Sequence, residues 1–257
     1  MAAGADVIKF YADYRRKIMR FPPVQAHPYI GGMPFPPSDP NPQVVMFTQE
    51  EMNAIVEEAT MANLPVACHA GTEKGAIMAA KAGVTTIEHG SVGSEALIKA
   101  MQHHDTIYVP TLAATEAIRP EEVPQAQAWV RKVHENGVTL AAGGDTGVFN
   151  HGDGAREMEL MIGAGIPVEK VLQAGTLGGW KACGGVACGY EFGHFKKGAR
   201  ADIIALESDP RKDATALRRV SFVMKDGKVW KNAFYPIGIV EELRRECEPL
   251  VCSWEVV

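Results

Sequence analysis

The sequence predicts an α/β fold in which helices cover a parallel sheet and a small β unit closes the chain. Short apolar stretches alternate with helical patterns through most of the 257 residues, as they do in strand–helix–strand units. Beyond residue 196 the pattern changes to the apolar–polar alternation of half-buried strands, and Asp226-Gly227 is a strong hairpin signal. Together these observations favour one large domain with a small appendage.

Five stretches have the composition of short parallel strands. Helices are expected between them, because parallel neighbours cannot be joined by tight turns. The segment at 21–43 is too rich in proline and glycine for regular structure, so we expect a long loop that forms one wall of a pocket. The five strand candidates are residues 7–11, 65–69, 85–89, 107–111 and 138–145.

The segments between these strands carry helix signals. Thr48 and Glu51 stand at capping-box spacing ahead of an apolar stripe, which predicts the start of a first helix. Gly83 predicts the end of a second helix, and a third is expected to begin near Ser94. After the last strand candidate we expect two helices divided at Gly165–Pro167.

The composition is that of a globular enzyme, with 46% apolar and 22% charged residues. The net charge of -5 argues against a nucleic-acid surface or an anionic-membrane surface. The five cysteines are odd in number and lack Cys-x-x-Cys spacing, so neither a disulfide framework nor a zinc knuckle is indicated. No secretory signal and no stretch long enough to span a bilayer is recognisable, so we expect a cytoplasmic protein.

Four residues with metal-binding or titratable side chains, Lys9, His69, His89 and Asp145, fall in or just after predicted strands. In a barrel of parallel strands the carboxyl ends converge on one face, so we expect these side chains to meet. Two imidazoles and a carboxylate suit zinc or another divalent ion with an open position for water. A neutral lysine amine can also take up carbon dioxide to form a carbamate, which is an anionic oxygen ligand.

Each of these four residues also has an ordinary structural interpretation. A single histidine at a strand end is more often a hydrogen-bonded structural residue than a ligand. Lys9 alone could be a surface charge, and Asp145 in GGDTG could be a turn or helix-cap residue. The metal-site hypothesis rests on all four falling at corresponding places in consecutive units.

Four segments taken together resemble the metal-dependent amidohydrolase superfamily, in particular its imidazolonepropionase-like, prolidase-like branch. They are GADVIKFYADYR, VACHAGTEKGAIMAAKAGVTTIEHGS, AAGGDTGVFNHGDGAREMELM and KKGARADIIALESDP, in family order. The resemblance implies a TIM-type (β/α)₈ barrel with a small β-sandwich domain. This chain then corresponds to a partial barrel of strands four to eight at 1–195, a β-sandwich portion at 196–235 and a C-terminal tail at 236–257.

The same resemblance implies roles for the strand-end residues. Lys9 matches a carboxylated lysine, and His69 and His89 match metal ligands. Asp145 matches the aspartate that binds metal and exchanges a proton with the hydrolytic water, so it is the predicted catalytic residue.

Two further pairs are candidate substrate-binding residues. Tyr14 and Arg15 follow the first strand and could hold a substrate carboxylate by hydrogen bonds. His151 and Arg156 lie in a segment that resembles a substrate-side loop of the family. For both pairs an ordinary surface or helix-capping role stays open.

One family feature is missing, because no His-x-His motif occurs in the sequence. In the family that motif ends the first strand and holds one of two metals, so we expect one ion here. We expect a second copy or another chain to complete the sheet; the alternatives are that the missing half exists in a longer gene product, or that the chain is a degraded relic. The predicted function is hydrolysis of an amide or cyclic C–N bond in a small molecule. The alternatives are a catalytically weak or inactive binding module, and a repurposed lyase or cyclase.

Overall fold

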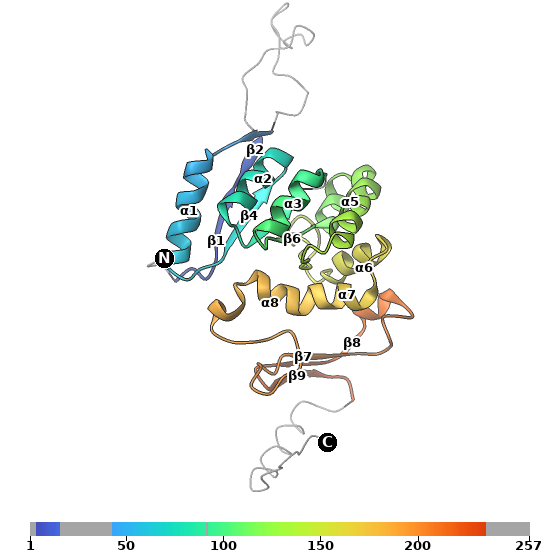
Figure 1. The fold of residues 1–257 in the computed structure, drawn as a ribbon. Helices are drawn as coiled ribbons and strands as arrows, with labels where there is room; N and C mark the ends of the chain where they lie inside the picture. Colours follow the sequence, from blue (N-terminus) through green and yellow to red (C-terminus); the bar gives the residue numbers. More distant parts are fainter. Residues whose placement is uncertain (1–3, 16–42, 91, 235–257) are drawn as a thin grey trace, which may run out of the picture.

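The central feature of the fold is a parallel four-stranded sheet, seen in a computed structural model that describes residues 4–15, 43–90 and 92–234 (Figure 1). Its strand order is β1-β4-β5-β6, and every neighbouring pair is parallel. These strands confirm four of the five strand predictions. They are β1 (Ile8–Tyr11), β4 (Val66–Ala70), β5 (Thr86–His89) and β6 (Ile107–Val109).

The prediction of a fifth strand at 138–145 was wrong. Leu140 makes only an isolated parallel bridge to Tyr108, next to β6. The chain then leaves the sheet, because the backbone N–H of Ala142 donates to the carbonyl of Ala174, 3.1 Å away, instead of continuing a ladder. The described strands therefore form an open sheet and no closed barrel. Completion of the sheet by another copy or chain stays a prediction.

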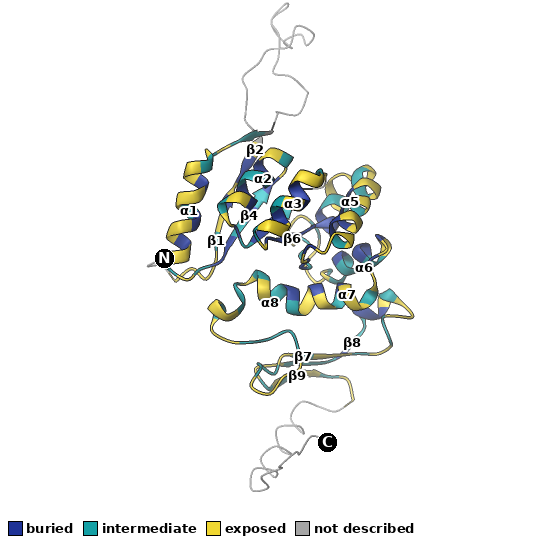
Figure 2. Cartoon of the chain, viewed as in Figure 1, coloured by how far each residue is buried: buried dark blue, intermediate teal, exposed yellow. Residues whose placement is uncertain are grey.

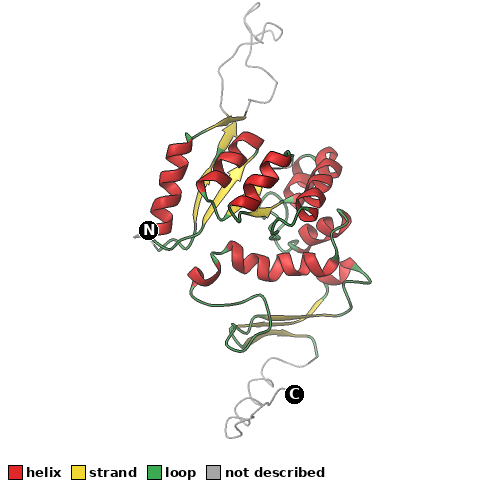
Figure 3. Cartoon of the chain, viewed as in Figure 1, coloured by secondary structure: helices red, strands yellow, loops and turns green. Residues whose placement is uncertain are grey.

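Three crossover helices lie side by side along one face of the sheet (Figure 3). The first begins at the predicted capping box of Thr48 and Glu51, and the second ends at Gly83, whose φ of 89° is the left-handed conformation that glycine adopts without strain. The third has the side chain of Ser94 as its cap. The helices are α1 (Gln49–Met61), α2 (Glu73–Ala82) and α3 (Glu95–His103).

A second group of helices follows β6 and surrounds the Leu140 segment. The predicted division at Gly165–Pro167 is confirmed, since the chain turns there between α6 and α7. The helices are α4 (Leu112–Ile118), α5 (Val123–Glu135), α6 (Ala155–Gly163), α7 (Val168–Gln173) and α8 (Gly179–Ala182), with a π-helical turn at Ala174–Gly178 and 3₁₀ turns at Pro120–Glu122, Gly185–Cys188 and Ala214–Arg218.

The chain closes with a three-stranded antiparallel sheet of β7 (Ile203–Leu206), β8 (Val220–Lys225) and β9 (Lys228–Asn232). Asp226 and Gly227 both have positive φ, 53° and 71°, as a two-residue hairpin turn requires, so the hairpin prediction is confirmed. The described residues form a single layer here, without a second one that would make a sandwich.

A small ribbon of β2 (Asp13–Arg15) and β3 (Gln43–Val45) was not predicted. The predicted loop at 21–43 and the predicted tail at 236–257 fall almost entirely outside the described residues.

The core lies between the parallel sheet and its helices, where the buried faces of both meet (Figure 2). Cys68 and Ile87 from the strands and Met52 and Met101 from the helices are fully buried. Burial raises the pKa of the Cys68 thiol to about 12, so this cysteine is a packing residue rather than a nucleophile. None of the helices in the described ranges combines the length and the apolar character needed to cross a membrane.

Candidate active site

A pocket of about 720 Å³ opens at the carboxyl ends of the parallel strands. Its size is in the range of small-molecule sites, and parallel sheets commonly bind ligands at this edge. All four residues predicted to converge from separate strands contribute to its wall. The principal side chains that line it are Lys9, Tyr11, Tyr14, His69, His89, Thr111, Arg119, Glu122, Gln125 and Asp145.

The two histidines lie next to each other in this pocket. Strands β4 and β5 are parallel neighbours whose register places Ala70 opposite His89, so their last residues are adjacent. The ring centroids of His69 and His89 are 4.5 Å apart, with the ring planes at 60°. Tyr11 also packs against His69, at 4.6 Å between ring centroids. The two imidazoles therefore share one wall of the pocket, at the ends of β4 and β5.

Both imidazoles are neutral near pH 7. Burial is the largest cause that lowers the pKa of His69. Burial, followed by repulsion from His69, lowers the pKa of His89 to about 4, although Asp145 opposes the shift. The neutral imidazole is the form that binds metal ions.

A hydrogen bond orients the second histidine. Nδ1 of His89 lies 2.8 Å from Oγ1 of Thr111, which directly precedes α4. With the proton on Nδ1 the ring donates to the hydroxyl, and Nε2 is left with a free lone pair. Metal-binding histidines in proteins are commonly held by such a hydrogen bond from the other ring nitrogen.

The backbone is strained around the pocket. His89, Thr111 and Asp145 have φ values of 72°, 51° and 62°, in the left-handed region that side-chain-bearing residues seldom adopt. They make up three of the six non-glycine residues with positive φ in the described part of the chain. Strain of this kind is maintained only where the surrounding structure enforces it, and it clusters at functional sites.

The donor set of this pocket suits a divalent ion with open coordination, because two neutral imidazoles already meet and Asp145 and Lys9 line the same wall. In the described ranges, however, no three side chains of His, Cys, Asp or Glu are gathered as a metal group. Asp145 therefore lines the same pocket as the two histidines but does not form a group of three ligands with them.

The sequence model of the amidohydrolase family matches residues 40–230. The chain belongs to this family. Ochratoxinase of Aspergillus niger is 30% identical over 214 residues, which are 76% of this chain and 44% of that protein. The predicted resemblance is thus confirmed, and the chain spans about half the length of the curated relatives that it matches.

Solved structures of amidohydrolases agree with the fold. A Xaa-Pro dipeptidase with methionine bound in its active site has a TM-score of 0.72 and 31% identity, over 90% of this chain and 56% of that one. The crystal structure of A. niger ochratoxinase has a TM-score of 0.70 and 26% identity, over 92% of this chain and 53% of that one. The fold is therefore a mixed α/β fold that resembles the TIM-barrel proteins of this family.

Only part of the predicted substrate-binding residues lies at the pocket. Tyr14 lines the pocket, but the side chain of Arg15 lies outside the described part of the structure. His151 is exposed on a turn, and Arg156 binds Glu116 at 2.6 Å. Neither His151 nor Arg156 lines the pocket, so their role toward a substrate stays a prediction.

Sequence reasoning missed two groups of residues at this site. Arg119 and Glu122, from the connection between α4 and α5, line the pocket and form an ion pair at 2.9 Å. Asp13 is fully buried behind the pocket, where its carboxylate accepts hydrogen bonds from the backbone N–H groups of Gly71 and Thr72 at 2.8 and 3.0 Å. It ties the start of β2 to the loop that follows β4.

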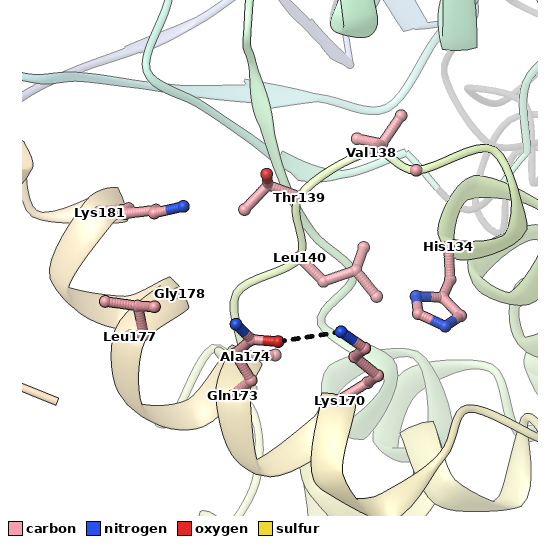
Figure 4. A pocket seen from close by; sticks show the side chains of 11 residues that line it. His134, Val138, Thr139, Leu140, Lys170, Gln173, Ala174, Leu177, Gly178 and Lys181 are labelled. Carbon is pink, nitrogen blue, oxygen red and sulfur yellow. Dashed lines mark hydrogen bonds between the residues drawn. The ribbon is translucent and has the colours of Figure 1, made fainter. Parts of the chain in front are cut away.

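A second pocket, of about 210 Å³, lies between α5, the Leu140 segment and the α7–α8 region (Figure 4). Lys170 and Gln173 point toward each other at its edge, with 3.4 Å between Nζ and Oε1. This pocket shares no lining residue with the larger one and contains neither imidazole of the histidine pair.

Proposed function

We propose that this chain carries the active site of a metal-dependent hydrolase that cleaves an amide bond in a small molecule. The observation that carries the proposal is the pair of neutral imidazoles, 4.5 Å apart, in a pocket shared with Lys9 and Asp145. Membership of the amidohydrolase family supports it. The similarity to a Xaa-Pro dipeptidase supports an amide as the bond that is cleaved.

His69 and His89 would hold the ion, with Asp145 and the carbamate of Lys9 as further oxygen ligands. A bound divalent ion, for which zinc is our first candidate, would polarise the amide carbonyl and lower the pKa of water to near neutrality. One ion per chain is proposed, because the chain lacks a His-x-His motif.

The side chains of the chain itself would move the protons and orient the substrate. Asp145 accepts a proton from the attacking water and donates it to the leaving nitrogen. The Tyr14 hydroxyl and the Arg119 guanidinium line the same pocket and would bind a substrate carboxylate. Thr111 keeps the His89 ring oriented during the reaction.

A substrate panel tests this function. We expect the purified chain, supplied with zinc, to hydrolyse at least one of a set of dipeptides, N-acyl amino acids and lactams, and to lose the activity when a chelator is added. Mass spectrometry of the products shows whether one water has been added. Products without added water would instead indicate a lyase or cyclase, and binding without any turnover would indicate a binding module.

A further inference from the structure

Helix α4 begins without a capping hydrogen bond from the side chain of its own N-cap residue. Thr111 occupies the N-cap position, where a threonine side chain commonly accepts a hydrogen bond from a backbone N–H of the first turn. Here Thr111 has φ 51° and ψ 44°, in the left-handed region, and its side chain makes no capping hydrogen bond. Its hydroxyl lies 2.8 Å from Nδ1 of His89 instead.

A carboxylate from another helix takes over the capping role. Glu157 of α6 is buried, with 1% of its surface exposed, and its Oε2 accepts a hydrogen bond of 2.8 Å from the backbone N–H of Ala113. Ala113 is the second residue of α4, so this N–H is among those that a cap would satisfy. A carboxylate there also interacts favourably with the helix dipole.

We propose that Glu157 is a positioning residue for His89: by capping α4 from α6, it leaves the Thr111 hydroxyl free to orient the imidazole. The proposal depends on the proposed function in one respect only, because it treats His89 as a metal ligand. Without the Glu157 carboxylate, the buried N–H of Ala113 has lost its acceptor, and Thr111, at the N-cap position of the same helix, carries a hydroxyl that can replace it. A capping threonine takes the extended conformation, and that change would withdraw Thr111 from His89.

The neighbouring contacts provide a matched control. Arg156, next to Glu157, binds Glu116 of α4 at 2.6 Å, so a second carboxylate also links α4 and α6. That ion pair is partly exposed, and among the described residues it forms no hydrogen bond with Thr111 or Ala113. Glu116→Gln therefore weakens the contact between the two helices and leaves the cap intact.

The test reads the His89 ring directly, by ¹⁵N NMR of the full chain with labelled histidine and without metal. His89→Gln assigns its signals. In the wild type we expect one fixed tautomer with the proton on Nδ1. Glu157→Met, which keeps the side-chain volume but has no acceptor, should give averaged ring signals like those of Thr111→Val. Glu157→Gln, which keeps an acceptor oxygen, and Glu116→Gln should both give the wild-type signals.

Two results would overturn the proposal. One is a wild-type His89 spectrum in Glu157→Met while Thr111→Val is altered, and the other is an equal change in Glu116→Gln. If Glu157→Met does not fold, Glu157→Asp withdraws the acceptor by one methylene, and unchanged His89 signals there would contradict the proposal. The NMR experiment does not measure turnover. A chain that hydrolyses no substrate would therefore refute the proposed function without changing the conclusion about the His89 ring.

Discussion

Asp145→Asn is expected to lower kcat for amide hydrolysis by roughly two to four orders of magnitude, the usual contribution of a general acid–base group. An amide cannot accept the proton of the attacking water or return it to the leaving nitrogen. The backbone should tolerate the change, because asparagine adopts the left-handed conformation that Asp145 has, with φ 62°. Steady-state kinetics on the best substrate of the panel measures the effect.

Asp153→Asn is the matched control for this experiment. Asp153 lies eight positions further along the same connection, outside the pocket, and forms an ion pair with Arg218. It should leave kcat within about twofold of the wild type, since an exposed ion pair contributes little. Equal losses in both variants, or a full rate in Asp145→Asn, would contradict the role assigned to Asp145.

Glu157→Gln is expected to change how the stability of the chain depends on pH. Burial raises the pKa of Glu157 to about 7, against the hydrogen bonds from Ala113 and Leu112 that lower it. The folded wild type therefore holds this proton more tightly than the unfolded chain does. Its free energy of unfolding should fall as pH rises from about 4.5 to about 7, and stay low above that range.

Glutamine resembles the protonated acid and does not ionise, so the variant lacks this loss. Between pH 5 and pH 8, the free energy of unfolding of Glu157→Gln should therefore increase by about 2 to 3 kcal/mol relative to that of the wild type. Urea unfolding at the two pH values measures the difference. Glu116→Gln is the control. Arg156 lowers the pKa of Glu116, so the contribution of Glu116 to the free energy of unfolding rises with pH instead of falling. The same stability difference at both pH values would show that Glu157 is already ionised at pH 5.

The parts of the fold that local sequence determines were predictable. The caps at Thr48 and Ser94 involve backbone groups two or three positions away, so the pattern is visible in a short window. The strand candidate at 138–145 failed for a non-local reason. A Cβ atom on Gly143 would lie 2.9 Å from Val109, and the backbone N–H of Ala142 donates to the carbonyl of Ala174, directly after α7, rather than along a ladder. No short window shows that packing.

The candidate site divides in the same way. His69 and His89 were predictable, because a strand end fixes the position of the side chain that follows it. Asp13 and Glu157 were not, since their hydrogen-bond partners lie 58 and 44 positions away in the sequence. Arg156 was predicted near the substrate, but its ion pair with Glu116 spans 40 positions and depends on how α4 packs on α6.

Zinc binding by the full chain tests the central claim most directly. After equilibrium dialysis and elemental analysis, we predict about one zinc ion per wild-type chain and less than about a tenth in the His69→Ala/His89→Ala double variant. The matched control is His103→Ala/His104→Ala, a pair with rings 4.7 Å apart that lies outside the pocket and should leave binding unchanged. A wild-type chain with less than about a tenth of an equivalent, or equal binding in both double variants, would contradict a metal site at the ends of β4 and β5.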